Sequence, residues 1–198
     1  ASSHVFGNSA PELADENTPF CPDSAYAISK TAGLRCCQLL RQQDHLFAAT
    51  GILFHHDSPL RKHSFVSQKI VRGALRARRD SSSKLALGDL DAMADWGYAP
   101  DYVDAIFRIL QLPRPDDFVV ASGEQHSVRE FAEAAFREVG LDWRQHVESD
   151  NRLLQRRAHP VRGNSAKLRS ATGWAPTVDF NAFVSKLVHE TEKIYEVG

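Results

Sequence analysis

The feature that most constrains the fold is an alternation of short apolar runs with segments of helical spacing. Residues 46–54 form a near-continuous apolar run of strand length. Such a run suits a parallel strand covered on both faces, because side chains on both sides of that strand are buried. Shorter strand-like runs follow at 84–87, 117–121 and 145–148. Strands alternating with helices predict an α/β protein with a mostly parallel sheet.

Local signals predict where the helices begin and end. Ser24 can cap a helix that runs to about residue 43, and Ser127 with Glu130 has the spacing of a capping box. Asn164 and Asp179 are further candidate caps, and Gly173 is placed to end a short helix. We therefore expect helices over 24–43, 65–79, 99–111, 127–139, 164–173 and 179–196.

The segments between these elements are expected to be loops, with one exception at the start of the chain. Residues 8–23, 55–64 and 150–162 have loop composition, and the last of them is rich in arginine. Residues 1–7 resemble the tail of a buried strand, which needs neighbours on both sides. We therefore expect further residues upstream of this segment in the protein.

Composition excludes several classes of function. The 198 residues include 24 Lys+Arg and 25 Asp+Glu, a formal net charge of −1. This balance lacks the positive excess on which general nucleic-acid and anionic-membrane binders rely. No apolar run approaches the roughly 20 residues of a spanning helix. The three cysteines, two of them adjacent, favour a reducing compartment over a disulfide framework. We expect a cytoplasmic enzyme or small-molecule binder.

One pair of residues has a spacing that suits acid–base chemistry. Tyr26 and Lys30 lie four positions apart, so a helix brings them to one face. A neighbouring ammonium favours phenolate over phenol, and the tyrosine could then exchange a proton with a sugar hydroxyl. Ser2, at the expected strand end, could hold the same substrate oxygen. Taken alone, a tyrosine and a lysine at this spacing are more often part of an ordinary amphipathic surface.

The context of this pair is more specific than the pair itself. A strand end with hydroxyl residues, a proline-rich loop, a Tyr-x-x-x-Lys helix and a buried strand follow one another, as in the second half of the nucleotide-binding domain of short-chain dehydrogenase/reductases. In the extended branch of these enzymes, the chain resembles the GDP-mannose 4,6-dehydratase family. The resemblance covers essentially the whole chain through blocks at 26–30, 51–59, 65–70, 87–92, 95–103, 121–131, 163–167 and 173–176.

The resemblance implies an activity and a set of site residues. In that family NADP oxidises C4 of the hexose of GDP-mannose, water leaves across C5–C6, and the hydride returns to C6 to give GDP-4-keto-6-deoxymannose. By position, the implied roles fall on these residues: catalytic Ser2, His4, Tyr26 and Lys30; cofactor-binding Tyr26, Lys30, His56 and Arg61; substrate-binding Thr50, Lys69 and Arg156.

Four positions depart from the family pattern. His4 stands where the dehydratases carry the glutamate that removes the C5 proton, and Thr50 replaces an asparagine. Ala94 replaces an arginine that resembles a phosphate contact, and residues 155–158 replace an Arg-Pro-x-Glu segment. A nucleotide-sugar 4-keto reductase or epimerase, or a catalytically degenerate binding or assembly module, is therefore an alternative. None of the 11 glycines forms a Gly-x-x-Gly-x-x-Gly turn, which favours a fragment of a longer protein.

The resemblance also implies a domain organisation and partners. Residues 1–54 are expected to be the C-terminal part of an NADP-binding, Rossmann-like domain. Residues 55–198 are expected to form mostly a smaller α/β substrate-binding domain, with 84–121 returning to the Rossmann sheet. A homodimer or homotetramer is expected on resemblance alone. A metal site is not expected at His55-His56-Asp57, because adjacent strand residues point to opposite sides and no further ligand completes a set.

Overall fold

The structure, a computed structural model, describes residues 1–8, 10–153 and 160–195. The chain forms two compact units. The first comprises Ala1–His56, Ala94–Gln125 and Ala158–Thr177, and the second comprises Asp57–Met93, His126–Arg157 and Val178–Gly198. Of the stretch 84–121, residues 94–121 thus lie in the first unit and residues 84–93 in the second.

The first unit is built on parallel strands. Strand β2 (Thr50–Leu53) pairs in parallel with β7 (Asp117–Val120), and Ser2 forms an isolated parallel bridge with Leu53 on β2. A second parallel pair joins β1 (Leu13–Ala14) to β10 (Arg162–Gly163). The expected α/β class with parallel strands is confirmed.

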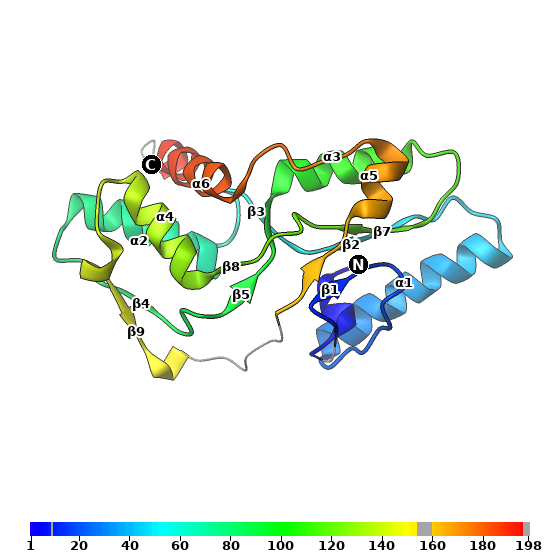
Figure 1. The fold of residues 1–198 in the computed structure, drawn as a ribbon, viewed down its shortest axis with the longest axis horizontal. Helices are drawn as coiled ribbons and strands as arrows, with labels where there is room; N and C mark the ends of the chain where they lie inside the picture. Colours follow the sequence, from blue (N-terminus) through cyan, green and yellow to red (C-terminus); the bar gives the residue numbers. More distant parts are fainter. Residues whose placement is uncertain (9, 154–159, 196–198) are drawn as a thin grey trace. The chain divides into compact units, whose positions relative to one another are not determined.

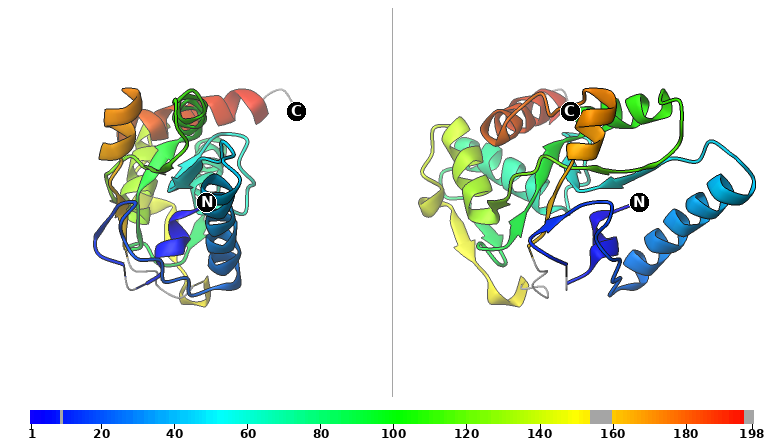
Figure 2. Two further views of the ribbon diagram at one scale, coloured as in Figure 1. Left: turned by 90° about the vertical axis from the view of Figure 1, so that its right-hand side faces the viewer. Right: turned by 45° about the vertical axis from the view of Figure 1, so that its right-hand side comes forward.

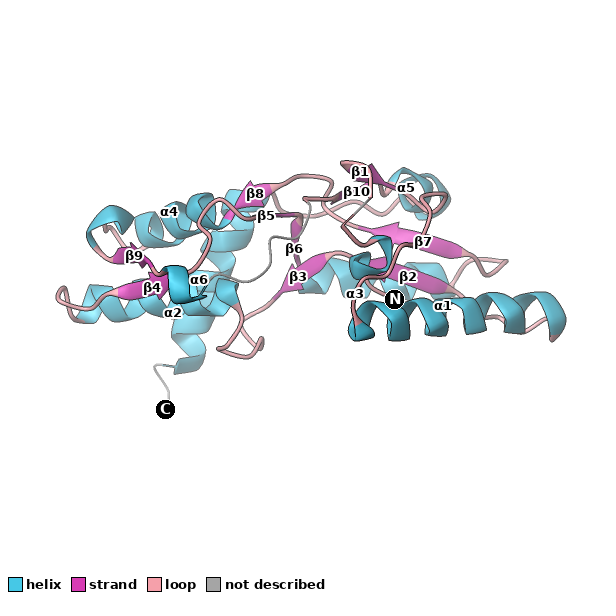
Figure 3. Ribbon diagram, turned by 90° about the horizontal axis from the view of Figure 1, so that it is seen from below, coloured by secondary structure: helices cyan, strands magenta, loops and turns pink. Residues whose placement is uncertain are grey.

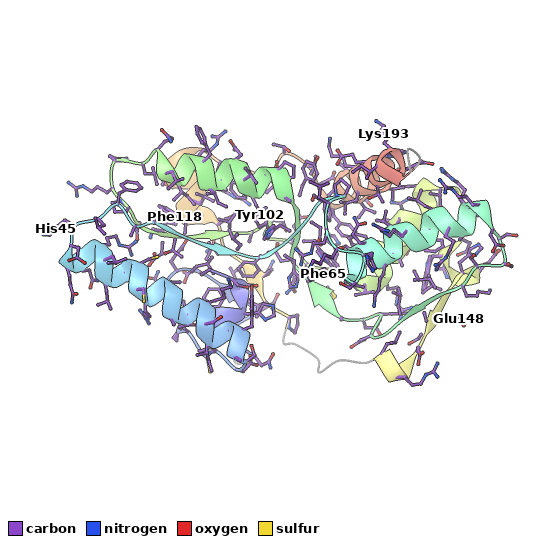
Figure 4. All side chains as sticks on the ribbon, turned by 180° about the vertical axis from the view of Figure 1, so that it is seen from behind. His45, Phe65, Tyr102, Phe118, Glu148 and Lys193 are labelled. Atoms are coloured by element: carbon purple, nitrogen blue, oxygen red, sulfur yellow. The ribbon has the colours of Figure 1, made fainter. Side chains whose placement is uncertain are left out.

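Helices cover both faces of β2 and β7 (Figures 1 and 3). Helix α1 (Ala25–Gln43) lies on one face, and α3 (Ala99–Leu110) with α5 (Ala166–Thr172) lies on the other. Buried side chains form a cluster on each face: Val5, Phe6, Leu34, Ile52, Phe54 and Val119 on the first, and Tyr102, Ala105, Ile109, Phe118, Val120, Leu168 and Trp174 on the second. Tyr102 and Phe118 are labelled in Figure 4, in the layer between α3 and the strands.

Helix α1 begins beside the opening segment (Figure 2), and only Ala27 and Leu34 of its residues are buried. Ser24 caps it as expected, because its Oγ accepts the backbone N–H of Ala27 at 3.2 Å. Near the other end, Arg41 pairs with the buried carboxylate of Asp117 at 3.0 Å, and Gln38 donates to the same carboxylate at 2.6 Å. Most of the helix surface between these points is exposed.

The opening segment differs from the expected strand. Only Ser2 bridges β2, and the chain then turns into a short 3-10 helix, η1 (Ser3–Phe6). Ser2 caps this turn by accepting the backbone N–H of His4 at 3.4 Å. Gly7 ends it at φ 64°, where an added Cβ would lie 1.8 Å from the carbonyl oxygen of Cys21. A local cap and a glycine therefore override strand propensity here.

The second unit is a helical layer with a small parallel pair of strands. Helices α2 (Val66–Arg79), α4 (Val128–Glu138) and α6 (Phe180–Tyr195) pack on one another, and β4 (Leu85–Leu87) pairs with β9 (Val147–Ser149). The capping box of α4 is present in full. The remaining described elements are short: β3 (His55–Asp57), β5 (Met93–Ala94), β6 (Trp96–Tyr98), β8 (His126–Ser127), η2 (Trp143–Gln145) and η3 (Asn151–Leu153).

Several boundaries differ from those expected. Strand β3 lies inside a predicted loop, and β2 is shorter than the apolar run that predicted it, with Phe47 46% exposed. The N-cap of α5 is Ser165 rather than Asn164, although the Asn164 side chain accepts the N–H of Ala166 at 3.0 Å. In the described residues, none of the helices combines the length and apolar character needed to cross a bilayer.

Candidate active site

The predicted tyrosine and lysine are neighbours at the start of α1. The Lys30 ammonium lies 5.3 Å from the centre of the Tyr26 ring. Tyr26 is 52% exposed and Lys30 is also exposed, so both can reach a ligand. Among the described residues of this unit, neither the Tyr26 hydroxyl nor the Lys30 ammonium has a hydrogen-bond partner. The pair therefore belongs to an open surface and does not form part of the packed interior.

Ser2 and His4 come to the same place from the opening segment. The His4 ring meets the Tyr26 ring edge-on, with 5.5 Å between their centres. Ser2 is buried beside β2, and its capping bond to the backbone of His4 fixes the turn on which the imidazole is carried. The structure thus brings together four residues of the first unit that the sequence predicted as catalytic: Ser2, His4, Tyr26 and Lys30.

The strand register explains why these residues meet. Ser2 pairs in parallel with Leu53, the last residue of β2. Residues that follow Ser2 and residues that follow Leu53 therefore lie at the same carboxyl edge of the sheet. In open α/β sheets, ligands bind outside this edge. The hydroxyl, imidazole and ammonium groups lie where an α/β enzyme would hold its substrate.

Two adjacent histidines, His55 and His56, follow Phe54, and their side chains point to different sides of the strand. His55 is exposed, and its ring centre lies 6.3 Å from that of His4. His56 instead stacks on Tyr102 of α3 at 4.9 Å, and its Nδ1 lies 2.8 Å from the carbonyl oxygen of Phe54. A carbonyl only accepts, so this contact favours the tautomer with its proton on Nδ1. His56 was predicted as a cofactor contact, whereas His55 was not predicted as a site residue.

The other predicted site residues lie elsewhere. Thr50 is buried at the amino end of β2, opposite the edge that carries Tyr26. Arg61 belongs to the second unit, where it pairs with Asp57 at 3.0 Å and lies over the Phe65 ring at 3.9 Å. Lys69 is exposed on α2 of the same unit. Arg156 lies outside the described residues.

A buried carboxylate fixes the backbone beyond β7. Asp95 accepts the N–H groups of Ser122, Gly123 and Gly163 at 2.9, 3.1 and 2.9 Å, and the Ser122 hydroxyl at 2.6 Å. Burial raises the pKa of Asp95 above its ordinary value, while these hydrogen bonds act in the opposite direction. Asp95 therefore holds the loop after β7 to Gly163 at the end of β10. In the sequence, this position was marked by the family-like block at 95–103.

The described residues contain no cluster of three or more His, Cys, Asp or Glu side chains that could hold a metal ion. Of the residues at this edge, the tyrosine, lysine, serine and two histidines suit proton transfer to and from a hydroxyl-bearing ligand.

Comparison with known proteins assigns the family. The family model described as GDP-mannose 4,6 dehydratase matches residues 1–187. The chain belongs to this family. It is 42% identical over 190 residues to GDP-mannose 4,6 dehydratase 1 of Arabidopsis thaliana, covering 96% of this chain and 52% of that protein. The Homo sapiens GDP-mannose 4,6 dehydratase is 34% identical over 207 residues, covering 96% of this chain and 56% of that protein. The chain thus spans about half the length of these curated relatives.

Solved structures match this member of the GDP-mannose 4,6-dehydratase family over its whole length. RMD from Pseudomonas aeruginosa, solved with NADPH, superimposes with a TM-score of 0.85 and 23% identity, covering 98% of this chain and 65% of that one. The dTDP-glucose 4,6-dehydratase of Bacillus anthracis, solved with NAD, has a TM-score of 0.88 and 20% identity, covering 99% and 61%. These similarities show a Rossmann-like α/β fold.

Proposed function

We propose that the protein acts in the conversion of GDP-mannose to GDP-4-keto-6-deoxymannose, with NADP as cofactor. The carrying observation is the juxtaposition of His4, Tyr26 and Lys30 at the carboxyl edge of β2. Membership of the GDP-mannose 4,6-dehydratase family supports the choice of substrate and cofactor. The reaction is an internal oxidation, elimination and reduction, so no net oxidant is consumed.

The residues present suit the nicotinamide end of such a cofactor. Tyr26 and Lys30 are exposed, and neither polar group has a partner among the described residues of its unit. Lys30 would bind the ribose hydroxyls and stabilise a phenolate on Tyr26 through its charge. NADP, when bound, supplies a hydride acceptor for C4 and a hydride donor for C6. Tyr26 would remove the proton of the C4 hydroxyl, which Ser2 would help to position.

His4 supplies the base for the second step. Once C4 is a ketone, the proton on C5 is acidified, and a base beside it can remove it. Imidazole accepts a proton near neutral pH, so His4 can serve where the family carries glutamate. Its edge-on contact with Tyr26 supports this role, because Tyr26 would act at the neighbouring carbon.

Most of the predicted phosphate and nucleotide contacts remain part of the proposal. Lys69 and Arg156 would bind the nucleotide sugar through their cationic groups. Thr50, the third predicted substrate contact, is not included, because it is buried at the amino end of β2, opposite the edge that carries Tyr26. Arg61 and His56 would lie on the cofactor side. We also propose that the protein is cytoplasmic and assembles as a homodimer or homotetramer, as expected from the resemblance.

Replacement of Tyr26 by phenylalanine tests this function. The full chain is incubated with GDP-mannose and NADP, and the 4-keto-6-deoxy product is followed by mass spectrometry. Tyr26→Phe removes only the hydroxyl of a half-exposed side chain, so the fold should persist while turnover falls about 10²–10⁴-fold. Thr31→Val is the control, because it removes from the same helix a hydroxyl that donates to the backbone carbonyl of Ala27 at 2.9 Å. Equal turnover by Tyr26→Phe and the unsubstituted chain would refute the mechanism.

A second function is favoured by one observation. A 4-keto reductase or epimerase needs the tyrosine, lysine and serine but no base for C5, and His4 replaces the family's glutamate. In the same assay, this alternative predicts no product from GDP-mannose but NADPH-dependent consumption of the 4-keto sugar. Absence of both activities would favour a binding or assembly module.

A further inference from the structure

The cluster at the carboxyl edge contains a second imidazole that the reaction described above does not use. His55 begins strand β3, and its ring lies 6.3 Å from the ring of His4 at an interplanar angle of 52°. His4 in turn lies 5.5 Å from Tyr26. All three side chains are exposed and belong to the same unit. Two neighbouring imidazoles, one of them beside a tyrosine, therefore lie on a surface that a ligand can reach.

The backbone determines which of the two adjacent histidines joins this cluster. Strand β2 pairs with β7 up to the N–H of Phe54, which donates to Val120, whereas β3, which begins at His55, pairs with β6. The chain therefore changes its partner strand between Phe54 and His55. Phe54 packs against Phe6 with 6.3 Å between ring centres, and His55 also approaches the opening segment through His4. Two successive side chains thus take the same side, which a regular strand does not allow. His56 is turned to the other side, against α3.

The elimination step needs two groups in opposite protonation states. Loss of water breaks the C5–H and C6–O bonds, and the electron pair of the first forms the C5=C6 double bond. The C6 oxygen leaves with the electron pair of the second and needs a proton to depart as water. One group must therefore accept a proton while another, about 3 Å from the departing oxygen, donates one.

We propose that His4 and His55 are this pair: His4 removes the C5 proton, and protonated His55 donates a proton to the departing C6 hydroxyl. The proposal rests on the dehydratase function given above. The two rings are neighbours and both are exposed, so one imidazole can lie beside C5 and the other beside the C6 oxygen of the same hexose. An imidazole acts as a base when neutral and as an acid when protonated, which are the two roles that the elimination requires.

The test separates the acid from the base with a substrate whose leaving group needs no proton. GDP-6-deoxy-6-fluoromannose loses fluoride, so removal of the acid should matter little, whereas removal of the base should still matter. With GDP-mannose, His55→Gln and His4→Gln should each lower turnover of the full chain about 10²–10⁴-fold. With the fluoro substrate, fluoride release by His55→Gln should return to within about tenfold of the unsubstituted chain, and that by His4→Gln should remain low.

Proton exchange in D₂O gives a second, independent reading. His55→Gln keeps the base, so recovered GDP-mannose should acquire deuterium at C5 although little product forms. His4→Gln should acquire none. His63→Gln is the control, because His63 is an exposed histidine of the second unit outside this cluster, and it should behave as the unsubstituted chain.

The outcomes distinguish this proposal from the function on which it rests. If the unsubstituted chain forms no product from GDP-mannose, the proposed function fails, and the acid–base pair fails with it. If that chain is active, and His55→Gln is as active or is not rescued by the fluoro substrate, only the role of His55 is overturned. Rescue of His55→Gln together with deuterium at C5 supports it.

Discussion

Helix α1 in the first unit and helix α2 in the second unit are held in place in different ways. Helix α1 has 19 residues, of which only Ala27 and Leu34 are buried. Helix α2 has 14 residues and buries eight of them. The helix that carries the candidate catalytic pair is therefore the one with less packing. Side chains that must meet a ligand cannot also fill a core, so the site is found on the thinly packed helix.

The kinds of contact differ as well. Near its C-terminal end, α1 is tied to the sheet by charge: Arg41 and Gln38 both contact the carboxylate of Asp117. In the second unit, α4 packs through aromatic rings: Phe131 lies edge-on against Phe180 and Phe183 at 5.9 and 6.0 Å. The position of α1 should thus be sensitive to loss of a polar group, and that of α4 to loss of apolar volume.

The largest predicted effect is a cavity in the second unit. Phe136 on α4 has no exposed surface and stacks on His146 with ring centres 5.7 Å apart. Phe136→Ala should lower the free energy of unfolding by about 3–5 kcal/mol, since the buried volume cannot be refilled. Phe107→Ala is the matched control, because Phe107 on α3 is 62% exposed.

Hydrogen exchange of the full chain measures this difference unit by unit. Phe136→Ala should reduce amide protection in α2, α4 and α6, because these helices pack on one another. Phe107→Ala should change protection little in either unit. Equal loss of protection in both variants would show that burial of the side chain does not determine the size of the effect.

The next effect concerns the polar attachment of α1. Asp117→Ala removes the carboxylate that pairs with the half-buried Arg41 guanidinium at 3.0 Å, leaving that cation without its partner. We expect a loss of about 2–3 kcal/mol, in the range for charged hydrogen bonds whose partner is left unpaired. Chemical denaturation followed by circular dichroism measures it. Leu39→Ala on the same helix should change stability by less than about 0.5 kcal/mol, because Leu39 is 50% exposed. A larger loss from Leu39→Ala would contradict the view that α1 is held by polar contacts.

Local sequence was sufficient where one short segment decides the structure. The caps at Ser24 and Ser127 were predicted from the residue type and its position, and both accept the expected backbone N–H groups. Gly173 ends α5 at φ 66°, in the left-handed region that glycine tolerates. The proximity of Tyr26 and Lys30 follows from helical spacing alone.

Other features depend on long-range packing, and the local sequence did not predict them. The run at 46–54 predicted a covered strand, but its first residues precede β2, and Leu46 is 51% exposed. No periodicity distinguished His55 from His56, because the change of partner strand after Phe54 sets which side each takes. The sequence marked Asp95 only as part of a family-like block. Its structural role depends on Gly163, 68 positions later, whose N–H donates to its carboxylate.

The smallest predicted effect compares how helices start in the two units. Helix α1 has a serine cap with an alanine at its third position, whereas α4 has a full capping box in which Glu130 also accepts the Ser127 N–H at 2.6 Å. This hydrogen bond lowers the pKa of Glu130. Its contribution is therefore complete above the ordinary glutamate value of about 4.3 and is lost as pH falls through the lower native pKa.

Glu130→Ala should accordingly cost about 0.5 kcal/mol at pH 7, a low value because the side chain is half exposed. The difference from the unsubstituted chain should shrink as pH falls below about 4, when the carboxylate is protonated in both the native and unfolded states. Glu133→Ala, on the exposed side of the same helix, controls for helix propensity and should show no such convergence. Urea denaturation at pH 7 and pH 3.5 measures both variants. A difference that stayed constant with pH would mean that the Ser127 hydroxyl alone holds the start of α4, as the Ser24 hydroxyl does for α1.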